Sequence, residues 1–259
     1  MSHEEHTRRL GFLWPGTRGA VSDLASLVQS LFPDGLAVAD IAYTTIGEGQ
    51  NVHTIEALLD TGARWRLRDG AITLKAREAD VAMWACTSGS FVFGLSGAQR
   101  QADELAEDFK GPASSTSLAF VRALEALDID QVAVAASYPE QLTRPFLDLL
   151  AEAGHEVVAC RSHGIMSGGE AFRLLSEDKL VEFVRAADHP RAKAILVPDT
   201  AISTVGGIGR FEAAVGKTVL TANQVTVWEA LRLLDAIPSR EGAGSLFTGS
   251  PLASSNVHK

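Results

Sequence analysis

The chain has 259 residues and 46% hydrophobic content, enough to bury a sizeable core as one large domain or as two domains of average size. Its 23 Lys and Arg against 32 Asp and Glu give a formal net charge of −9. The sequence has no basic cluster, which disfavours nucleic acid as a partner. No apolar stretch is long enough to span a bilayer, and the charged segment 1–9 lacks the apolar run of a secretory signal. We therefore expect a cytoplasmic protein without a membrane partner.

The first half of the chain alternates strand and helix patterns. Short apolar runs predict strands, and apolar residues at helical spacing predict the helices between them. The turn Pro15-Gly16 cannot lie in a helix interior. The predicted elements are a strand at 10–14, a helix from about 22 that stops at 33–35, a strand at 37–43, helical segments at 55–67 and 74–76, and a strand at 81–85. This half is predicted to be β-α-β-α-β.

The same order restarts at about residue 131. Gly154 ends the first helix of this half, and Ser167-Gly168-Gly169-Glu170 has the form of a capping box before a later helix. The predicted elements are a helix at 118–127, a strand at 132–136, a helix at 142–153, a strand at 156–160, helical stretches near 172–175 and 179–187, and a strand at 194–197. The repeated order indicates a duplicated α/β unit whose strand ends form two facing crevices.

The domain boundaries follow from this repeat. We expect an N-terminal α/β domain over 9–112, to which a strand at 218–220 and a helix at 225–234 return, so that 217–237 belongs to it. The second α/β domain spans 113–216. The Ser- and Gly-rich tail 238–259 is expected to be loosely ordered and is assigned no chemistry.

Cys86 is the main candidate for chemistry. It follows a predicted strand and precedes Thr87, Ser88 and Gly89, so its thiolate is expected to be favoured by helix N-terminal N–H groups. Such a thiolate could act as a nucleophile or as a proton-transfer base. The alternative is a small core residue. The second cysteine, Cys160, is interpreted as structural, and the two cysteines are too few for a disulfide framework.

Asp199 occupies the equivalent place in the second half, after Pro198. It is either a helix cap or an acid that delivers a proton opposite Cys86. Tyr138 could hydrogen-bond a substrate anion or only pack. Arg18 could pair with a dianion or lie on the surface. The substrate-binding residues expected at these strand ends are Pro15, Gly16, Arg18, Thr87, Ser88, Tyr138, Thr200 and Ala201.

Other patterns carry weaker signals. Gly206-Gly207-Ile208-Gly209 lacks the spacing of a dinucleotide loop, and no Walker lysine follows it. The histidines, among them His53, His155, His163 and His189, do not form a metal-ligand pattern. We therefore expect no metal, and the glycine-rich segment is only a weak indication of a nucleotide loop.

The strand-end segments Cys86-Thr87-Ser88 and Pro198-Asp199-Thr200, with Tyr138 after the middle strand, resemble the aspartate/glutamate racemase superfamily. The match is to its branch of maleate cis-trans isomerases and arylmalonate decarboxylases, and it extends over about 9–235. It includes the segments Cys160-Arg161-Ser162 and Thr221-Ala222-Asn223-Gln224. The resemblance implies two Rossmann-like (flavodoxin-like) domains with parallel sheets, related by a pseudo-twofold, with the active site in the cleft between them. It also implies cofactor-independent chemistry and a possible homo-oligomer.

The resemblance places Cys86 where the isomerases keep their nucleophilic first cysteine and where the decarboxylases have a glycine. It places Thr87, Ser88 and Tyr138 where a substrate carboxylate or its enediolate is held. The chain departs from the pattern at Asp199, because both kinds of enzyme carry a cysteine there.

The sequence thus predicts an isomerase-like enzyme acting on a small (di)carboxylate, similar to maleate cis-trans isomerase, with Cys86 as nucleophile or base and Asp199 as the opposing acid. Two alternatives stay open. One is an arylmalonate-type decarboxylase or a racemase of the same superfamily, and the other is a non-catalytic protein that binds a small carboxylate.

Overall fold

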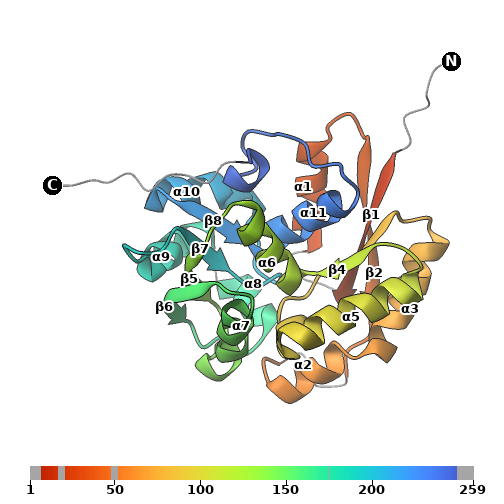
Figure 1. Ribbon diagram of the computed structural model, residues 1–259, viewed down its shortest axis with the longest axis horizontal. Coiled ribbons are helices and arrows are strands. Elements are labelled where there is room, and N and C mark those ends of the chain that lie inside the picture. The colour runs from red at the N-terminus through yellow and green to blue at the C-terminus, as the bar shows by residue number, and fades with distance from the viewer. Residues whose placement is uncertain (1–6, 17–20, 48–51, 175, 250–259) are drawn as a thin grey trace.

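The computed structural model describes residues 7–16, 21–47, 52–174 and 176–249. Within these residues the chain forms two four-stranded sheets, and every neighbouring pair of strands is parallel (Figure 1). The strands are β1 (Arg8–Pro15), β2 (Ala37–Thr44), β3 (Val81–Trp84), β4 (Ala113–Ser115), β5 (Gln131–Ala136), β6 (Glu156–Ser162), β7 (Ala194–Val197) and β8 (Thr218–Thr221). The sheet orders are β2-β1-β3-β4 and β6-β5-β7-β8, so the α/β fold with two similar halves is confirmed.

Helices connect the strands and cover both sheets. They are α1 (Val21–Leu31), α2 (Ile55–Thr61), α3 (Arg64–Ala76), α4 (Ser88–Phe91), α5 (Gly94–Phe109), α6 (Thr116–Ala126), α7 (Glu140–Glu152), α8 (Gly168–Leu174), α9 (Glu177–Ala187), α10 (Ile208–Val215) and α11 (Ala222–Leu233), with 3₁₀ turns η1 (Val205–Gly207) and η2 (Ser245–Phe247). None of the described helices is long and apolar enough to cross a membrane.

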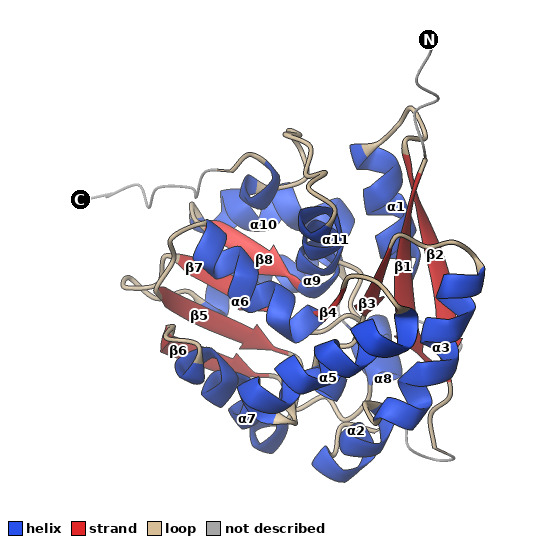
Figure 2. Ribbon diagram, turned by 45° about the vertical axis from the view of Figure 1, so that its right-hand side comes forward, coloured by secondary structure: helices blue, strands red, loops and turns tan. Residues whose placement is uncertain are grey.

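The first sheet is buried on both faces, as expected for parallel strands. Successive side chains of β1 point to opposite sides. Phe12 packs in one apolar cluster with Leu24 and Leu27 of α1, whereas Leu13 packs in another with residues of α3 and α5. Helices α1 and α11 therefore cover one face of this sheet, and α3 and α5 cover the other (Figure 2).

The second sheet repeats the arrangement. Val134 of β5 points toward α6 and α7, and Ala133 points toward α9 and α10. The two halves share one core, because the cluster that contains Phe12 also contains Val134 and Leu196 of the second sheet. Helices α6 and α11, each directly after the last strand of a sheet, pack against one another, and Thr116 Oγ1 lies 2.6 Å from Thr226 Oγ1.

Strand pairing corrects the expected assignment of two strands. The sequence assigns 113–216 to the second domain, yet β4 pairs with β3 through Ala82 and Ala113. It assigns 217–237 to the first domain, yet β8 pairs with β7 through Ala194 and Thr218. Each half therefore completes its own sheet before the chain crosses. Only the following helix, α11, returns to pack on α1 and the first sheet.

Two further segments differ from expectation. Residues 94–109, for which the sequence predicts no element, form α5. The tail from residue 238 is not loosely ordered through residue 248: the side chain of Phe247 is buried, Gln224 Nε2 donates to Ala243 O at 2.8 Å, and the buried Glu212 accepts a 2.6 Å hydrogen bond from Ser245 Oγ. A buried carboxylate with several donors holds this segment, a contact that composition cannot reveal.

Candidate active site

The carboxyl ends of β3, β5 and β7 bring three candidate residues together. Cys86 follows β3, Tyr138 follows β5 and Asp199 follows β7, and all three side chains are at least nine-tenths buried. The negative charge of Asp199 raises the pKa of both Cys86 and Tyr138. Tyr138 and Asp199 follow neighbouring strands of the second sheet and Cys86 follows a strand of the first, so the carboxyl ends of strands from both sheets meet at this site.

Cys86 is held as a neutral thiol. The Gly89 N–H donates to its Sγ at 3.3 Å, and Ser88 Oγ lies 3.9 Å away. These donors favour a thiolate, but burial outweighs them and raises the pKa of Cys86 to about 11. The expected N–H donor to the sulfur is therefore present, but burial has the larger effect on the pKa of Cys86. Helix α4 has only 4 residues, and the N–H groups at its start do not compensate the loss of solvation of a Cys86 thiolate.

Asp199 is a buried carboxylate with two donors. Ser137 Oγ donates to its Oδ2 at 2.5 Å, and the Ala201 N–H donates to its Oδ1 at 2.9 Å. The contact to the residue two positions later is an Asx-type turn, and no described helix begins there, so Asp199 is not a helix cap. Burial raises the pKa of Asp199, and a positive charge on His53 opposes this rise.

His53 enters the site from the loop between β2 and α2. Its ring meets the Tyr138 ring edge-on, with 5.0 Å between centroids. Its Nδ1 lies 2.8 Å from Ile165 O, and its backbone N–H donates to Met166 O at 2.7 Å, so this loop of the first half is tied to the second half. Burial, followed by the charges of Asp199 and Cys86, raises the pKa of Tyr138 well above its ordinary value.

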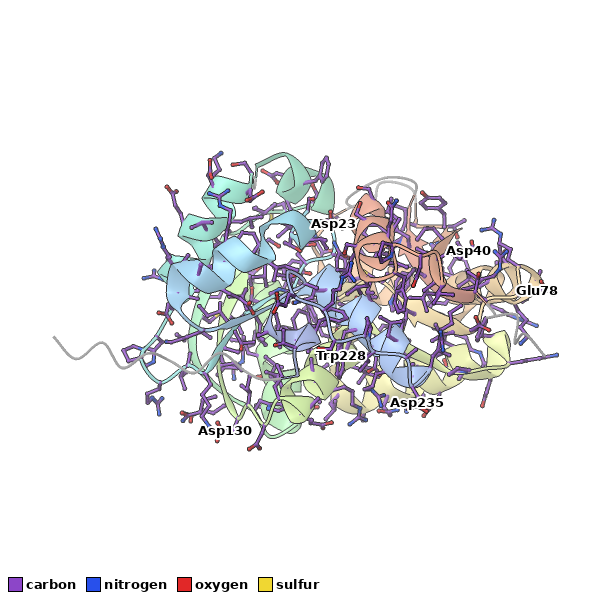
Figure 3. All side chains as sticks on the ribbon, turned by 90° about the horizontal axis from the view of Figure 1, so that it is seen from above. Asp23, Asp40, Glu78, Asp130, Trp228 and Asp235 are labelled. Carbon is purple, nitrogen blue, oxygen red and sulfur yellow. The ribbon has the colours of Figure 1, made fainter. Side chains whose placement is uncertain are left out.

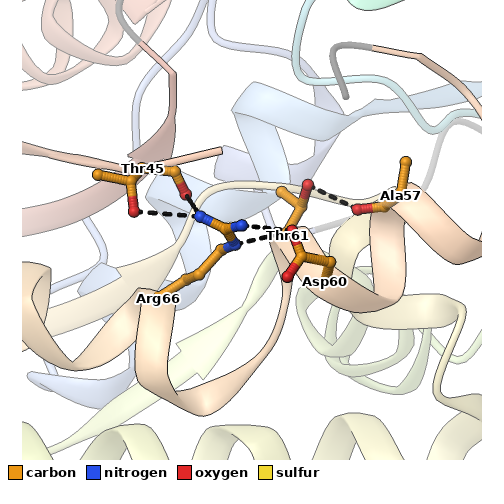
Figure 4. Close-up of polar contacts among 5 residues, drawn as sticks. All are labelled: Thr45, Ala57, Asp60, Thr61 and Arg66. Carbon is orange, nitrogen blue, oxygen red and sulfur yellow. Dashed lines mark hydrogen bonds and ion pairs between the residues drawn. The ribbon is translucent and has the colours of Figure 1, made fainter. Parts of the chain in front are cut away.

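Arg66 anchors the chain on both sides of His53. Its guanidinium donates to Asp60 Oδ2 of α2 through Nε at 2.9 Å, and its Nη1 lies 3.3 Å from both Thr45 O and Thr45 Oγ1 (Figure 4). Thr45 follows β2 directly. A single planar cation therefore links Thr45, which directly follows β2, to Asp60 near the end of α2.

The remaining predicted residues lie around this group. Thr87 Oγ1 is buried without a hydrogen-bond partner among the described residues, so its hydroxyl is free to bind a ligand oxygen. Ser117 Oγ donates to Thr87 O at 2.8 Å and fixes that turn. Thr200 presents its carbonyl to Asn223 Nδ2 at 3.1 Å, so its backbone faces away toward α11.

The first strand end lies beside Cys86. Because Leu13 pairs with Trp84, the segment Pro15–Gly16 leaves the sheet next to the chain that leads into Cys86. Gly16 has a φ of +77° and donates to Thr44 O at 3.0 Å. Arg18 lies outside the described residues.

Sequence reasoning did not assign His53, Ser137 or Asn223 to the site, although Asn223 lies in a segment that carries the family resemblance. Ser137 follows β5 directly and carries the same strand-end signal as Thr87, so that signal could have found it. His53 comes from a loop and reaches the site only through tertiary contacts, for which no local pattern exists. In the part of the chain that the structure describes, no three His, Cys, Asp or Glu side chains are grouped to hold a metal ion.

The family model for arylmalonate decarboxylase matches residues 33–247. The chain belongs to this family. An arylmalonate decarboxylase from Bordetella bronchiseptica is 28% identical over 250 residues, which cover 94% of this chain and 98% of the relative. A maleate isomerase from Pseudomonas putida is 26% identical over 187 residues, covering 70% of this chain and 74% of that protein. The resemblance drawn from the strand-end motifs is confirmed, and the relatives in both branches are enzymes.

Solved structures agree with this placement. A doubly substituted arylmalonate decarboxylase in its liganded form superposes with a TM-score of 0.81 at 26% identity, covering 93% of this chain and 99% of that one. The maleate isomerase of Pseudomonas putida S16 superposes with a TM-score of 0.84 at 20% identity, covering 93% and 98%. At that identity the second match establishes the two-domain fold.

Proposed function

We propose that the protein is a cofactor-independent enzyme that acts on a small dicarboxylate, with cis–trans isomerisation of a maleate-type substrate as its first candidate reaction. The observation that carries the proposal is the burial of the Cys86 thiol and the Asp199 carboxylate at strand ends near enough for the charge of Asp199 to act on the thiol. A thiol and a carboxylate placed in one site can exchange a proton when a substrate arrives. Neither group needs an external cofactor for this exchange.

The proposed isomerisation balances within the site. Cys86 passes its proton to Asp199 and the sulfur adds to one alkene carbon, so that the alkene electron pair moves onto the adjacent carboxylate as an enediolate. The former double bond is now single and rotates. The enediolate then re-forms the alkene and expels the thiolate, which recovers its proton from Asp199. The unpartnered Thr87 hydroxyl and the Tyr138 phenol are the donors proposed to hold the enediolate.

A second candidate is decarboxylation of a malonate-type acid, which the high pKa of Cys86 favours. Loss of carbon dioxide leaves the bond's electron pair on an enediolate, and a neutral thiol can protonate that carbon directly. The thiolate formed would then take a proton from solvent. This second candidate is supported by the match to an arylmalonate decarboxylase, which extends over 98% of that relative.

The test follows both reactions by proton NMR. Wild-type protein is incubated separately with maleate and with phenylmalonate, and the products sought are fumarate and phenylacetate. Cys86→Ala and Asp199→Asn are expected to lose at least about a hundredfold in rate, and Cys160→Ala, at the exposed cysteine, to retain it. Full turnover by Cys86→Ala would overturn the mechanism. Maleate binding by calorimetry without turnover of either acid would indicate the non-catalytic binding protein instead.

A further inference from the structure

The loop that carries Asp199 is anchored to the other half of the molecule by Asp23. Asp23 lies in the first turn of α1, and its side chain is buried where the orange α1 meets the blue elements of the second half (Figure 3). Ser203 Oγ donates to Asp23 Oδ1 at 2.6 Å. The backbone N–H groups of Thr204 and Val205 donate to Oδ2 at 2.7 and 3.1 Å. These donors are about 180 residues away in sequence.

The Asp23 carboxylate is also connected to the turn that contains Asp199 through the side chain of Asn223. Asn223 is fully buried at the start of α11, and its Nδ2 lies 3.5 Å from Asp23 Oδ2. That amide group also donates to Thr200 O at 3.1 Å and to Ile202 O at 3.3 Å. Thr200 lies within the turn that Asp199 forms with Ala201, and Ile202 directly follows it. The carboxylate therefore lies at the centre of the contacts that hold the segment 200–205.

The electrostatics favour a charged anchor here. Asp23 accepts from two consecutive N–H groups at the start of η1, where an anion is stabilised by unpaired backbone donors. Within the described residues the donors to this carboxylate are a hydroxyl, two backbone N–H groups and an amide, so its hydrogen bonds go to the loop and to α11. A buried carboxylate with such donors is costly to disturb.

We propose that Asp23 is a positioning residue for Asp199: it fastens the Asp199 loop of the second half to α1 of the first half and so fixes the carboxylate relative to Cys86. This inference rests on the proposed function, because the consequence of misplacement is lost proton transfer. A shift of about 1 Å in a reacting group can reduce turnover about a hundredfold. The expected defect is in kcat, with KM little changed.

The test compares Asp23→Asn with Glu212→Gln. Glu212 is a matched control, because it is equally buried and also accepts from backbone N–H groups and a serine hydroxyl, but it holds the segment around Ser245. Hydrogen exchange is followed by mass spectrometry in peptides covering 199–207. In Asp23→Asn exchange of this segment should accelerate about tenfold or more, and in Glu212→Gln it should not. Unchanged exchange in Asp23→Asn would overturn the inference whatever the enzyme's activity.

A double-variant cycle tests the route through Asp199. Asp23→Asn should lower kcat at least about tenfold in the wild-type background and have little further effect in Asp199→Asn. An equal loss in both backgrounds would mean that Asp23 acts only on stability and would overturn the inference. If Asp199→Asn keeps full activity, the proposed function of Asp199 fails instead. Ser203→Ala removes a single contact to Asp23 and should show a smaller change of the same kind if Asp23→Asn does not fold.

Discussion

The hydroxyl of Ser137 donates a 2.5 Å hydrogen bond to the carboxylate of Asp199, across 62 residues of sequence. Both residues follow neighbouring strands of the second sheet, and both are buried. This hydrogen bond favours the ionised carboxylate, but burial outweighs it, and the pKa of Asp199 is raised. The buried carboxylate therefore lowers the free energy of unfolding, a cost that functional sites commonly carry.

Asp199→Asn is expected to stabilise the protein at neutral pH. Because the folded-state pKa of Asp199 is raised, the stability that this group contributes is complete below its unfolded pKa of about 3.9 and is lost as pH rises through the folded value. The amide keeps an acceptor for the Ala201 N–H. Urea unfolding should show a gain on the order of 1 kcal/mol at pH 7.5 that shrinks toward pH 4.

A matched control should change in the opposite direction. Asp188 Oδ1 accepts a 2.7 Å hydrogen bond from the buried Lys217 Nζ, so Asp188→Asn should lower stability at pH 7.5. If Asp199→Asn were instead the less stable of the two at that pH, the assigned cost of the Asp199 charge would be wrong.

His53→Gln is expected to move the acidic limb of the kcat/KM profile to higher pH. A positive charge on His53 lowers the pKa of Asp199, so without it the carboxylate is protonated at a higher pH and cannot accept the proton of Cys86. The other charged or titratable groups that act within this cluster are Cys86 and Tyr138.

The control for this variant is His155→Gln. His155 is also buried, and its Nδ1 lies 2.9 Å from Ile129 O, as His53 Nδ1 lies 2.8 Å from Ile165 O. The two substitutions remove the same ring and a similar hydrogen bond. Only His53→Gln should displace the acidic limb, and an equal displacement in both variants would assign the effect to general loosening of the fold.

Alkylation of Cys86 should follow a titration centred near pH 11. Only the thiolate reacts, and burial raises the pKa of Cys86 to about that value. Asp199→Asn should lower the midpoint because the charge of Asp199 contributes to the rise. Iodoacetamide labelling read separately at Cys86 and at the exposed Cys160 gives both rates in one sample. A Cys86 midpoint below pH 9 would contradict the neutral resting thiol.

The apolar strands and most connecting helices could be predicted from the sequence, but the membership of two strands could not. Buried strands such as Val81–Trp84 carry a continuous apolar run. By contrast, β4 has 3 residues, two of them Ser, and resembles a turn, whereas β8 is predicted as a strand but its 4 residues do not indicate which sheet it joins. Their place is set by pairing with β3 and β7, which is a tertiary property.

The candidate site divides in the same way. Cys86, Tyr138 and Asp199 could be predicted because strand ends in parallel sheets converge on one edge. The charge state of Cys86 could not be predicted, since burial outweighs the local donors. His53 and Asp23 act through contacts with residues more than 100 positions away, and no local spacing encodes those contacts.

Gly89→Ala should impair catalysis more than stability. A Cβ at this position would lie 3.1 Å from Cys86 Sγ and 3.1 Å from Trp84 Cζ2, so the thiol must shift by a few tenths of an ångström. Alanine is otherwise favoured over glycine in a helix by about 0.5–1 kcal/mol, which offsets part of the crowding. Turnover should fall about tenfold or more, because proton transfer depends steeply on position, while the urea midpoint changes little. Gly209→Ala, in α10 with open space around the added carbon, should keep full turnover. Equal activity of the two variants would show that the position of the Cys86 thiol does not limit the reaction.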